Sequence, residues 1–420
     1  MDLTECIVAG GRAGPRCRSC GAPLQRSVAD LGVQPFANAF LTAEQLESAE
    51  PRYPLHAYVC ESCWLVQLAH SASPDELFSD YAYFSSYSDT WLEHARIYAE
   101  AMAERLSLGH ESFVVEVASN DGYLLRNFAE RGIPVLGIEP ARNVAEYAIS
   151  VGVPTEIAFL GGVTARDLRS RGVVAELLVG NNVLAHVPDL NDFISGLAIL
   201  LAPEGTLTME FPHVLRLLQE HQFDTIYHEH YSYFSLTAVQ AAFARHDLAL
   251  EEVEEIPTHG GSLRVYLGHA DRPGPAHSSV GELLERERRA GLLEADTYTR
   301  LGIDAAAVRD GLRAFLEEAQ REGKRVAGYG APAKGNTLLN YCGVSTDLLP
   351  YTVDRSPHKQ GHFLPGSHLP IHPPERLLED RPDYVLILPW NLKDEIVDQM
   401  SVVRSWGGRF VVPIPEIRTV

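Results

Sequence analysis

Basic residues and long apolar runs are what this 420-residue sequence has least of. Lysine and arginine total 35 against 56 aspartates and glutamates, which gives a formal charge of −21 at pH 7. A chain this acidic repels a polyphosphate backbone, and no basic segment offsets the charge, so we expect no nucleic-acid partner. No stretch approaches the roughly 18 apolar residues that a membrane span needs, and residues 1–16 lack the apolar centre of a signal peptide. We therefore expect no membrane partner and a cytoplasmic location, in which thiols stay reduced.

The remaining composition is that of a folded globular protein. Hydrophobic residues make up 45% and charged residues 22% of the sequence, so the chain can bury a sizeable core. Its length is too great for one ordinary core and predicts two to three domains. The sequence contains neither a fixed-period repeat nor a low-complexity tract.

Cysteine is scarce, but four of the six cysteines form two CxxC pairs. Cys17 and Cys20 make the first pair, and Cys60 and Cys63 make the second. Two such pairs supply the four soft ligands of a structural zinc ion, which then has no open position for catalysis. Two disulfides are the alternative, and a reducing compartment disfavours them. The pattern therefore favours a metal site that stabilises a small N-terminal domain.

Short apolar strands that alternate with helices begin at residue 113. Strands are predicted at residues 113–118, 134–139, 176–180 and 205–211, and a hairpin is predicted at residues 248–267. This alternation is typical of a doubly wound α/β sheet, which binds ligands at the carboxyl ends of its strands. A charged helical segment follows, and a second strand, turn and helix begin near residue 325.

The turn after the first of these strands carries polar residues suited to a cofactor site. The candidates in and before this turn are Glu116, Ser119, Asn120, Asp121 and Gly122. Glu139 ends the next strand, where it can accept hydrogen bonds from the two ribose hydroxyls of a dinucleotide or of S-adenosylmethionine (SAM). A turn with one glycine cradles a pyrophosphate poorly, whereas SAM has no phosphate, so the turn favours SAM. Ordinary turn chemistry without a ligand is the alternative.

A second glycine-containing turn has the pattern Gly328-x-Gly330-x-x-x-Lys334-Gly335, which departs from the GxGxxG dinucleotide fingerprint. A lysine at a helix start suits a diphosphate, so a phosphorylated substrate fits this turn as well as NAD does. A purely structural turn is the third possibility. Tyr329, Lys334 and Asn336 are the candidate substrate-binding residues of this segment.

Polar aromatic residues are most concentrated between Tyr227 and Ser235. A neutral imidazole suits proton abstraction near neutral pH, and a neighbouring phenol or carboxylate can orient it. His230 is the candidate base and His228 a candidate substrate ligand, although either histidine can instead be structural. A metal site at His228 and His230 is less favoured because the local sequence offers no third ligand. His186 follows another strand of the same sheet and is the second catalytic candidate.

In their order along the chain, these motifs resemble those of a SAM-dependent sugar-nucleotide C-methyltransferase. The resemblance covers nearly the whole chain and is to the C-3-methyltransferases that act on dTDP-4-keto-deoxysugars in antibiotic pathways. It implies an N-terminal zinc-binding domain at residues 1–75 and a central Rossmann-like SAM-dependent methyltransferase domain at residues 76–275. A helical connector at residues 276–322 and a C-terminal Rossmann-like substrate-binding domain at residues 323–420 complete the expected architecture.

The resemblance also implies roles for individual residues. His230 matches the general base, with Tyr227 and Glu229 beside it, and His186 and Tyr81 match lesser active-site positions. Asn181 is expected to contact SAM.

The implied reaction removes a proton alpha to the 4-keto group of a dTDP-4-keto-(di)deoxyhexose, and the enolate then takes the methyl group of SAM. Methylation is expected at C3, with C5 as the alternative. An NAD-dependent sugar-nucleotide dehydrogenase and a non-enzymatic zinc scaffold are the rival interpretations, and the sequence predicts no oligomeric state.

Overall fold

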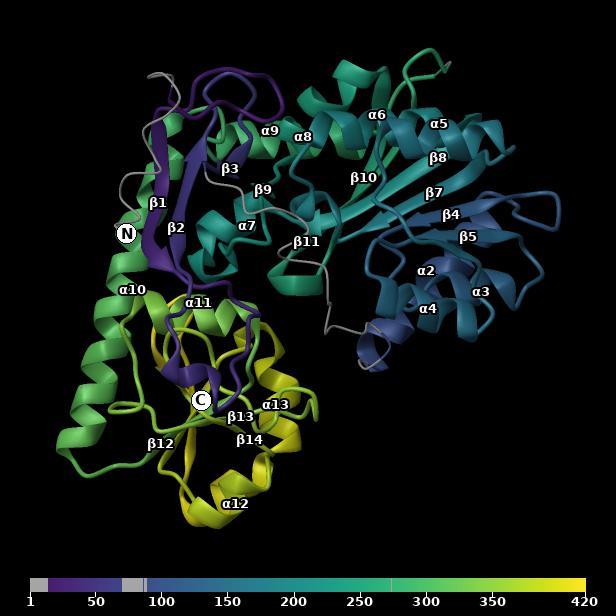
Figure 1. Cartoon of the computed structure of the whole chain (residues 1–420). Coiled ribbons are helices and arrows are strands. Elements are labelled where there is room, and N and C mark those ends of the chain that lie inside the picture. Colours follow the sequence, from purple (N-terminus) through teal and green to yellow (C-terminus); the bar gives the residue numbers. More distant parts are fainter. Residues whose placement is uncertain (1–13, 70–85, 87–88, 273) are drawn as a thin grey trace.

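The computed structural model describes residues 14–69, 86, 89–272 and 274–420, and its strands form three sheets (Figure 1). The first sheet is antiparallel, with the strand order β1-β2-β3-β9. Its strands are β1 (Arg26–Gln34), β2 (Tyr53–Val59), β3 (Val66–Leu68) and β9 (Ser232–Tyr233). The last strand comes from the aromatic cluster of the sequence, so a segment far along the chain completes the N-terminal sheet.

The second sheet has the order β10-β11-β8-β7-β4-β5-β6. Its strands are β4 (Val114–Val117), β5 (Val135–Ile138), β6 (Thr155–Glu156), β7 (Ala175–Asn181), β8 (Leu201–Pro212), β10 (Leu248–Ile256) and β11 (Ser262–His269). The strands from β8 to β6 run parallel, and the β10–β11 hairpin adds an antiparallel edge. The valines of β4 are buried on both faces, as expected in a sheet covered by helices on both sides.

Helices cover both faces of this second sheet (Figure 1). One face packs against α2 (Asp89–Arg105), α3 (Leu125–Ala129) and α4 (Arg142–Ser150). The other face packs against α5 (Gly162–Ser170), α6 (Leu190–Leu200) and α8 (Leu236–Phe243). Helix α7 (Val214–Gln219) follows β8. The doubly wound sheet predicted from the sequence is therefore confirmed.

The third sheet has the order β14-β13-β12-β15-β16-β17 and is parallel except for its last strand. Its strands are β12 (Val326–Tyr329), β13 (Thr352–Val353), β14 (Ile371–His372), β15 (Tyr384–Ile387), β16 (Arg409–Val412) and β17 (Arg418–Thr419). The remaining α-helices are α9 (Ser278–Arg289), α10 (Ala295–Arg321), α11 (Ala333–Tyr341), α12 (Arg376–Asp380) and α13 (Lys393–Gln399). Short 3-10 helices are η2 (Gln45–Glu47), η4 (Leu184–His186), η5 (Phe223–Thr225), η6 (Ala244–His246), η7 (Thr258–Gly260), η8 (Trp390–Leu392) and η9 (Ser401–Trp406).

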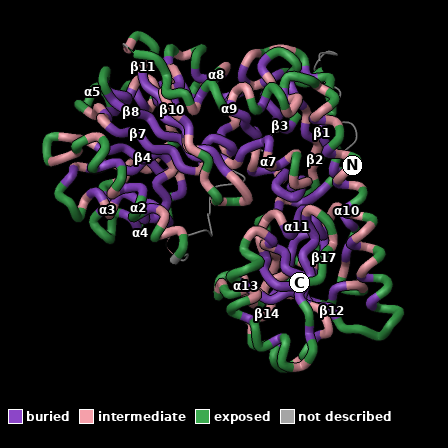
Figure 2. The backbone as a smooth tube through the Cα atoms, turned by 180° about the vertical axis from the view of Figure 1, so that it is seen from behind, coloured by how far each residue is buried: buried purple, intermediate pink, exposed green. Residues whose placement is uncertain are grey.

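One hydrophobic core joins the first and third sheets. Val28 and Leu55 of the first sheet and Leu386 of the third belong to the same buried cluster as Leu312 of α10 and Leu338 of α11. Figure 2 shows the burial concentrated in the strands, with exposed residues on the outer sides of the helices. The long helix α10 runs beside β1 and down to the third sheet, so it fixes the two sheets relative to each other (Figure 1).

In the ranges described above, no helix combines the length and the apolar character needed to cross a bilayer.

Candidate active site

A cavity of about 750 Å³ opens where the three sheets meet. Its wall includes Asn181 at the carboxyl end of β7 and Glu139 just after β5. The loop after β1 contributes Asn38, and the third sheet's first turn contributes Lys334. The cavity therefore lies at the edge where a doubly wound sheet binds its ligands, and residues next to the first and third sheets complete its wall.

The structure brings eight of the residues predicted from the sequence together in this wall. They are Asn120, Glu139, Asn181, His186, Tyr227, Glu229, His230 and Lys334. These residues come from segments up to about two hundred positions apart. Four of them end or follow strands of the second sheet, and the other four come from the segment before β9 and from the start of α11.

Glu139 is held by the backbone of the loops around it. Its carboxylate accepts hydrogen bonds from the N–H groups of Ala141 (2.8 Å) and Asn120 (3.0 Å). Burial raises the pKa of this carboxyl group, and those two hydrogen bonds lower it. Asn120 has a φ of +50° and Gly122 a φ of +79°, so the turn bends sharply at the cavity.

The other predicted residues of this turn lie behind the cavity wall. Glu116 is 1% exposed, and burial together with the nearby Asp121 carboxylate raises its pKa well above the usual value. Asp121 accepts a hydrogen bond from the N–H of Ser86 at 3.0 Å. Ser119 is fully buried against β5, where Gly137 leaves room for it. Glu116, Ser119, Asp121 and Gly122 therefore shape the loop, while Asn120 and Glu139 face the cavity.

Unpaired polar atoms mark the place for a cofactor. Both side-chain polar atoms of Asn181 and the side-chain oxygen of Asn182 are buried without a hydrogen-bond partner among the described residues. Leaving buried polar groups unpaired costs about 1–3 kcal/mol each, so such groups are normally satisfied by something bound. With the Glu139 carboxylate at the same sheet edge, these residues fit SAM, which offers ribose hydroxyls and an adenine ring but no phosphate.

His230 has a defined tautomer. Its Nδ1 lies 2.9 Å from the carbonyl oxygen of Thr225, which can only accept, so Nδ1 carries the proton. Its Nε2 therefore has the lone pair, and it accepts a hydrogen bond from the Tyr227 hydroxyl at 2.7 Å. Burial, and then His186, lower the pKa of His230 well below its usual value. The imidazole is thus neutral at physiological pH, with a basic nitrogen toward Tyr227.

Two further histidines of the wall are also neutral. Burial lowers the pKa of His186 to about 4 and that of His259 to about 4. The ring of His186 packs edge to face against His230, with centroids 4.8 Å apart. The site therefore presents neutral imidazoles rather than cations to a bound substrate.

Lys334 faces the cavity from the start of α11. Its Nζ donates to the side-chain oxygen of Asn391 at 2.7 Å and lies 4.6 Å from the ring centre of Trp390. Burial lowers the pKa of Lys334, and the nearby Asp224 carboxylate raises it. Asp224 in turn accepts a hydrogen bond from the Trp390 indole at 2.7 Å. The attraction between Lys334 and Asp224 thus links the start of α11 with η5.

Besides Glu116, Ser119, Asp121 and Gly122, four further predicted site residues do not line the cavity or cannot be placed. His228 is buried beside Phe36 and bonds the carbonyl oxygen of Tyr53 at 3.2 Å. Tyr329 lies in the core of the third sheet. Asn336 is 1% exposed and donates to the carbonyl oxygen of Ala37 at 3.0 Å. Tyr81 lies outside the described residues.

The cavity also contains residues that sequence reasoning did not single out. They are Phe36, Asn38, Phe40, Trp91, Tyr123, Asn182, His259 and Lys359. His259 sits in the turn of the β10–β11 hairpin with a φ of +56°, which is unusual for a histidine and is the one local signal that marks it. Asn182 lies next to the predicted Asn181, whereas the other six residues belong to no motif and reach the site only through the fold.

The four CxxC cysteines form a compact cluster. Their sulfur atoms all lie within 4.8 Å of one another, and the pairs Cys17–Cys63 and Cys20–Cys60 are each 3.5 Å apart. Tetrahedral zinc with bonds of about 2.3 Å needs sulfur atoms roughly 3.8 Å apart, so the cluster fits zinc. All four are free thiols, which contradicts the disulfide alternative. In the described parts of the chain, this is the one group of three or more His, Cys, Asp or Glu that can hold a metal, and it excludes His228 and His230.

The two CxxC turns have the same backbone form. In each, the residue after the second cysteine has a positive φ, +75° at Gly21 and +61° at Trp64. Its N–H donates to the carbonyl oxygen of the first cysteine, at 2.8 Å from Gly21 to Cys17 and at 2.8 Å from Trp64 to Cys60. The hydrogen bond with Cys63 lowers the pKa of the Cys17 thiol to about 4, so a thiolate, the form that binds zinc, is available.

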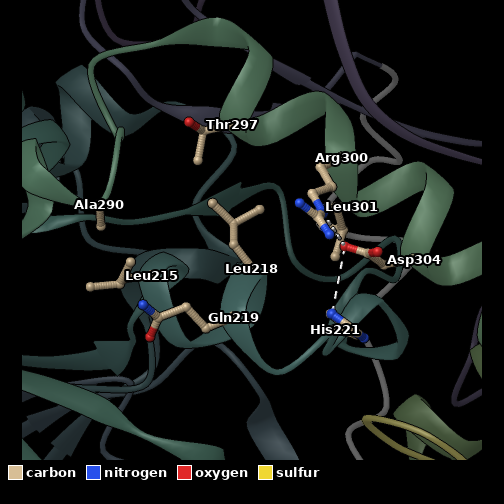
Figure 3. A pocket seen from close by; sticks show the side chains of 9 residues that line it. All are labelled: Leu215, Leu218, Gln219, His221, Ala290, Thr297, Arg300, Leu301 and Asp304. Atoms are coloured by element: carbon tan, nitrogen blue, oxygen red, sulfur yellow. Dashed lines mark ion pairs between the residues drawn. The ribbon is translucent and has the colours of Figure 1, made fainter.

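A second, smaller cavity of about 300 Å³ lies apart from this site, between α7 and α10. Figure 3 shows His221 and Arg300 turned toward the carboxylate of Asp304, with the apolar side chains of Leu215 and Leu218 beside them. The ion pairs are long, 3.6 Å from His221 and 3.7 Å from Arg300. Its lining contains none of the predicted site residues.

Comparisons with known proteins cover all three parts of the chain. Residues 17–78 match the family model of a zinc binding domain, and residues 91–253 match that of a methyltransferase domain. Residues 257–415 match the model of a C-methyltransferase C-terminal domain. The C-methyltransferase NovU of Streptomyces niveus is 38% identical over 404 residues, which are 96% of either chain.

Solved methyltransferases resemble only part of the chain. A SAM-dependent methyltransferase from Mesorhizobium loti is 17% identical, with a TM-score of 0.32, over 40% of this chain and 97% of its own. Magnesium protoporphyrin IX methyltransferase from Synechocystis PCC 6803, with bound SAM, is 14% identical, with a TM-score of 0.32, over 46% of this chain and 88% of its own.

The curated relative and the three matched segments settle the choice between the rival interpretations. Neither an NAD-dependent dehydrogenase nor a zinc scaffold without activity fits a C-methyltransferase relative that matches almost the whole chain. The cofactor is SAM, and zinc belongs to the four clustered cysteines. The chain belongs to the family of SAM-dependent C-methyltransferases, with an N-terminal zinc-binding domain, a central Rossmann-like SAM-binding domain and a C-terminal Rossmann-like α/β domain.

Proposed function

We propose that this enzyme methylates C3 of a dTDP-4-keto-deoxyhexose, with His230 as the base that removes the C3 proton. The observation that carries this proposal is the neutral His230, whose protonated Nδ1 is tied to Thr225 and whose basic Nε2 lies in the cavity wall. A carbon acid beside a ketone needs such a base within hydrogen-bond reach. When bound, SAM supplies the electrophilic methyl group that the enolate carbon takes.

Tyr227 has two parts in this proposal. In the structure its hydroxyl donates to Nε2 of His230 at 2.7 Å and keeps that nitrogen unprotonated. Rotation about the phenol C–O bond frees Nε2 and turns the O–H toward the keto oxygen of the substrate. One such donor at a developing oxyanion is worth roughly 3 kcal/mol of transition-state stabilisation. The neutral ring of His186 packs against His230 and contributes to the burial that lowers the pKa of His230.

Lys334 is the proposed contact for the diphosphate of the sugar nucleotide. It lines the cavity from the start of α11, where helix N–H groups also attract an anion. A diphosphate there places the sugar toward the middle of the cavity, between Lys334 and the Glu139 edge. The nucleotide therefore supplies binding energy that orients the reacting carbon.

Proton exchange tests the base separately from methyl transfer. We would incubate the enzyme with dTDP-4-keto-6-deoxyglucose in D2O without SAM and follow deuterium uptake by NMR. The proposal expects uptake at C3 with wild type and none above background with His230→Asn, while SAM affinity measured by calorimetry stays within twofold. Substitution of the exposed His110 by asparagine is the matched control and keeps full exchange.

The position of the label distinguishes the two candidate carbons, because C5 is also alpha to the ketone. Uptake at C5 alone assigns the methylation to C5 and leaves His230 as the base. Wild-type exchange in His230→Asn removes His230 from the mechanism.

A further inference from the structure

The loop after β1 belongs to the zinc-binding domain and forms part of the active-site wall. Asn38 of this loop lines the cavity, and its side-chain nitrogen lies 2.8 Å and 3.0 Å from the two carboxylate oxygens of Glu229. Glu229 is adjacent to His230 and is 4% exposed. A residue of the N-terminal domain therefore holds both oxygens of a buried carboxylate in the central motif.

The loop itself is fixed from two sides. Its Ala37 carbonyl oxygen accepts from the Asn336 side chain at 3.0 Å, and Leu41 exchanges two backbone hydrogen bonds with Phe363, of 3.0 Å and 2.9 Å. Phe36 stacks on Tyr53 of β2, with ring centres 4.6 Å apart and planes at 6°. Contacts with the first and third sheets thus hold the loop of Asn38 on both sides. Asn38 is therefore a rigid hydrogen-bond donor to Glu229.

The charge of Glu229 depends on this contact. Burial raises the pKa of Glu229 to about 7, and the hydrogen bond from Asn38 lowers it. The other titratable side chains in the wall are three carboxylates, three imidazoles, two ammonium groups and three phenols: Glu139, Asp189, Asp192, His186, His230, His259, Lys334, Lys359, Tyr123, Tyr227 and Tyr233. His186 and His259 are neutral near pH 7, as noted above, and the described residues form no ion pair within 4.0 Å of the Glu229 carboxylate. Asn38 is therefore the group that favours the ionised form.

We propose that Asn38 is a positioning residue that fixes the ionised carboxylate of Glu229 in the active-site wall as an acceptor for hydroxyl groups of the sugar. The inference rests on the proposed function, in which Glu229 belongs to the catalytic motif. One amide nitrogen bonded to both carboxylate oxygens leaves further lone pairs on each of them, so hydroxyl donors of a sugar can still bind. The zinc-binding domain then completes the active site and determines in part which sugar fits.

Steady-state kinetics with SAM and dTDP-4-keto-6-deoxyglucose test this assignment in the full-length enzyme. Asn38→Ala is expected to lower kcat/KM for the sugar about tenfold or more, because a hydrogen bond to a charged group is lost, while KM for SAM stays within twofold. The acid limb of the pH profile moves to higher pH, because the carboxyl group loses a bond that favours its ionised form. Part of the lost activity therefore returns as the pH is raised.

Asn38→Asp keeps the size of the side chain and is expected to move the acid limb further, because a second carboxylate faces Glu229. In the Glu229→Gln background, Asn38→Ala is expected to change kcat/KM less than twofold, since the carboxylate that it positions is gone. Zinc content and thermal unfolding verify that each variant is folded, and Asn38→Asp replaces Asn38→Ala if the latter fails this check.

Each of five results overturns the inference. Independent effects of the two substitutions, an unmoved acid limb, or equal losses for SAM and sugar all assign Asn38 a merely structural role. A Glu229→Gln enzyme with wild-type kcat/KM removes the role of Glu229 in the proposed function and the inference with it. Loss of activity in Glu229→Gln beside a fully active Asn38→Ala overturns the inference alone.

Discussion

A methyl group added at residue 137 tests whether the turn after β4 holds SAM. Gly137 lies in β5 beside Glu116 of β4, and its backbone passes directly under Ser119. A Cβ atom at this position falls 2.3 Å from the Ser119 hydroxyl oxygen and 2.9 Å from its Cβ. A new side-chain rotamer of Ser119 removes the first contact but not the second, so the backbone of the turn must move.

The size of the effect follows from that displacement. Non-bonded carbon atoms normally sit about 3.5–4.0 Å apart, so the turn has to move by roughly 0.5–1 Å. Overpacking of this kind costs about 1–3 kcal/mol, which corresponds to a SAM dissociation constant roughly 5- to 150-fold higher if the shift is carried into the site. Asn120, whose N–H contacts the Glu139 carboxylate at 3.0 Å, lies next in the chain and must follow.

Titration calorimetry with SAM measures the change directly. Gly109→Ala is the matched control, because a Cβ atom there meets nothing within 4 Å, and its dissociation constant stays at the wild-type value. Adding Ser119→Ala to Gly137→Ala restores little of the affinity, since the 2.9 Å contact with the Cβ atom of residue 119 remains. SAM affinity within twofold of wild type in Gly137→Ala would refute the placement of SAM at this turn.

Three further outcomes follow from buried groups elsewhere in the chain. Cys63→Ser is expected to give up zinc at a lower chelator concentration, because one of four clustered thiols is lost, and a metal-sensitive dye measures the release. Glu287→Ala is expected to lose about 3–5 kcal/mol in urea unfolding, because the buried carboxylate accepts from His213 (2.8 Å) and from the N–H groups of Leu236 and Thr237. These bonds hold the folded pKa of Glu287 below its unfolded value, so its stabilisation is present above about pH 5 and is lost as the pH falls. Glu287→Gln should flatten that acid limb of the stability curve, and an unchanged slope between pH 5 and 3 would contradict this assignment.

The sequence predicts the parts of the fold that depend on local pattern. The two CxxC pairs are recognisable because four thiols at that spacing have few uses in a reducing compartment, and their clustering confirms the metal site. The strands of the second sheet are recognisable because a parallel sheet buries both faces and produces short apolar runs. The cofactor-site position of Glu139 is predictable for the same reason, because this residue ends a short apolar strand at the sheet edge where ligands bind.

The rest depends on contacts between distant segments, which no local pattern encodes. Strand β9 has only two residues, Ser232 and Tyr233, and it forms because β3 offers an edge to it. Asn38 sits in a loop with no motif, and its contact with Glu229 spans 191 positions. His228 lies between Tyr227 and Glu229 in the sequence, but its side chain contacts the carbonyl oxygen of Tyr53 and does not line the cavity.

The zinc site has no open coordination position for catalysis, but backbone hydrogen bonds connect it to the catalytic motif. The second CxxC turn runs directly into β3, where the N–H of Leu68 donates to the carbonyl oxygen of Tyr231 at 3.0 Å. The N–H of Tyr231 in turn donates to the carbonyl oxygen of Ala185, beside His186, at 2.7 Å. Since Tyr231 follows His230, the cysteine cluster and both candidate catalytic histidines share one short path of backbone hydrogen bonds. Rigid support of this kind is what a base needs to stay within a fraction of an ångström of its proton, and the metal site next to β3 adds to the support that the shared core gives this sheet.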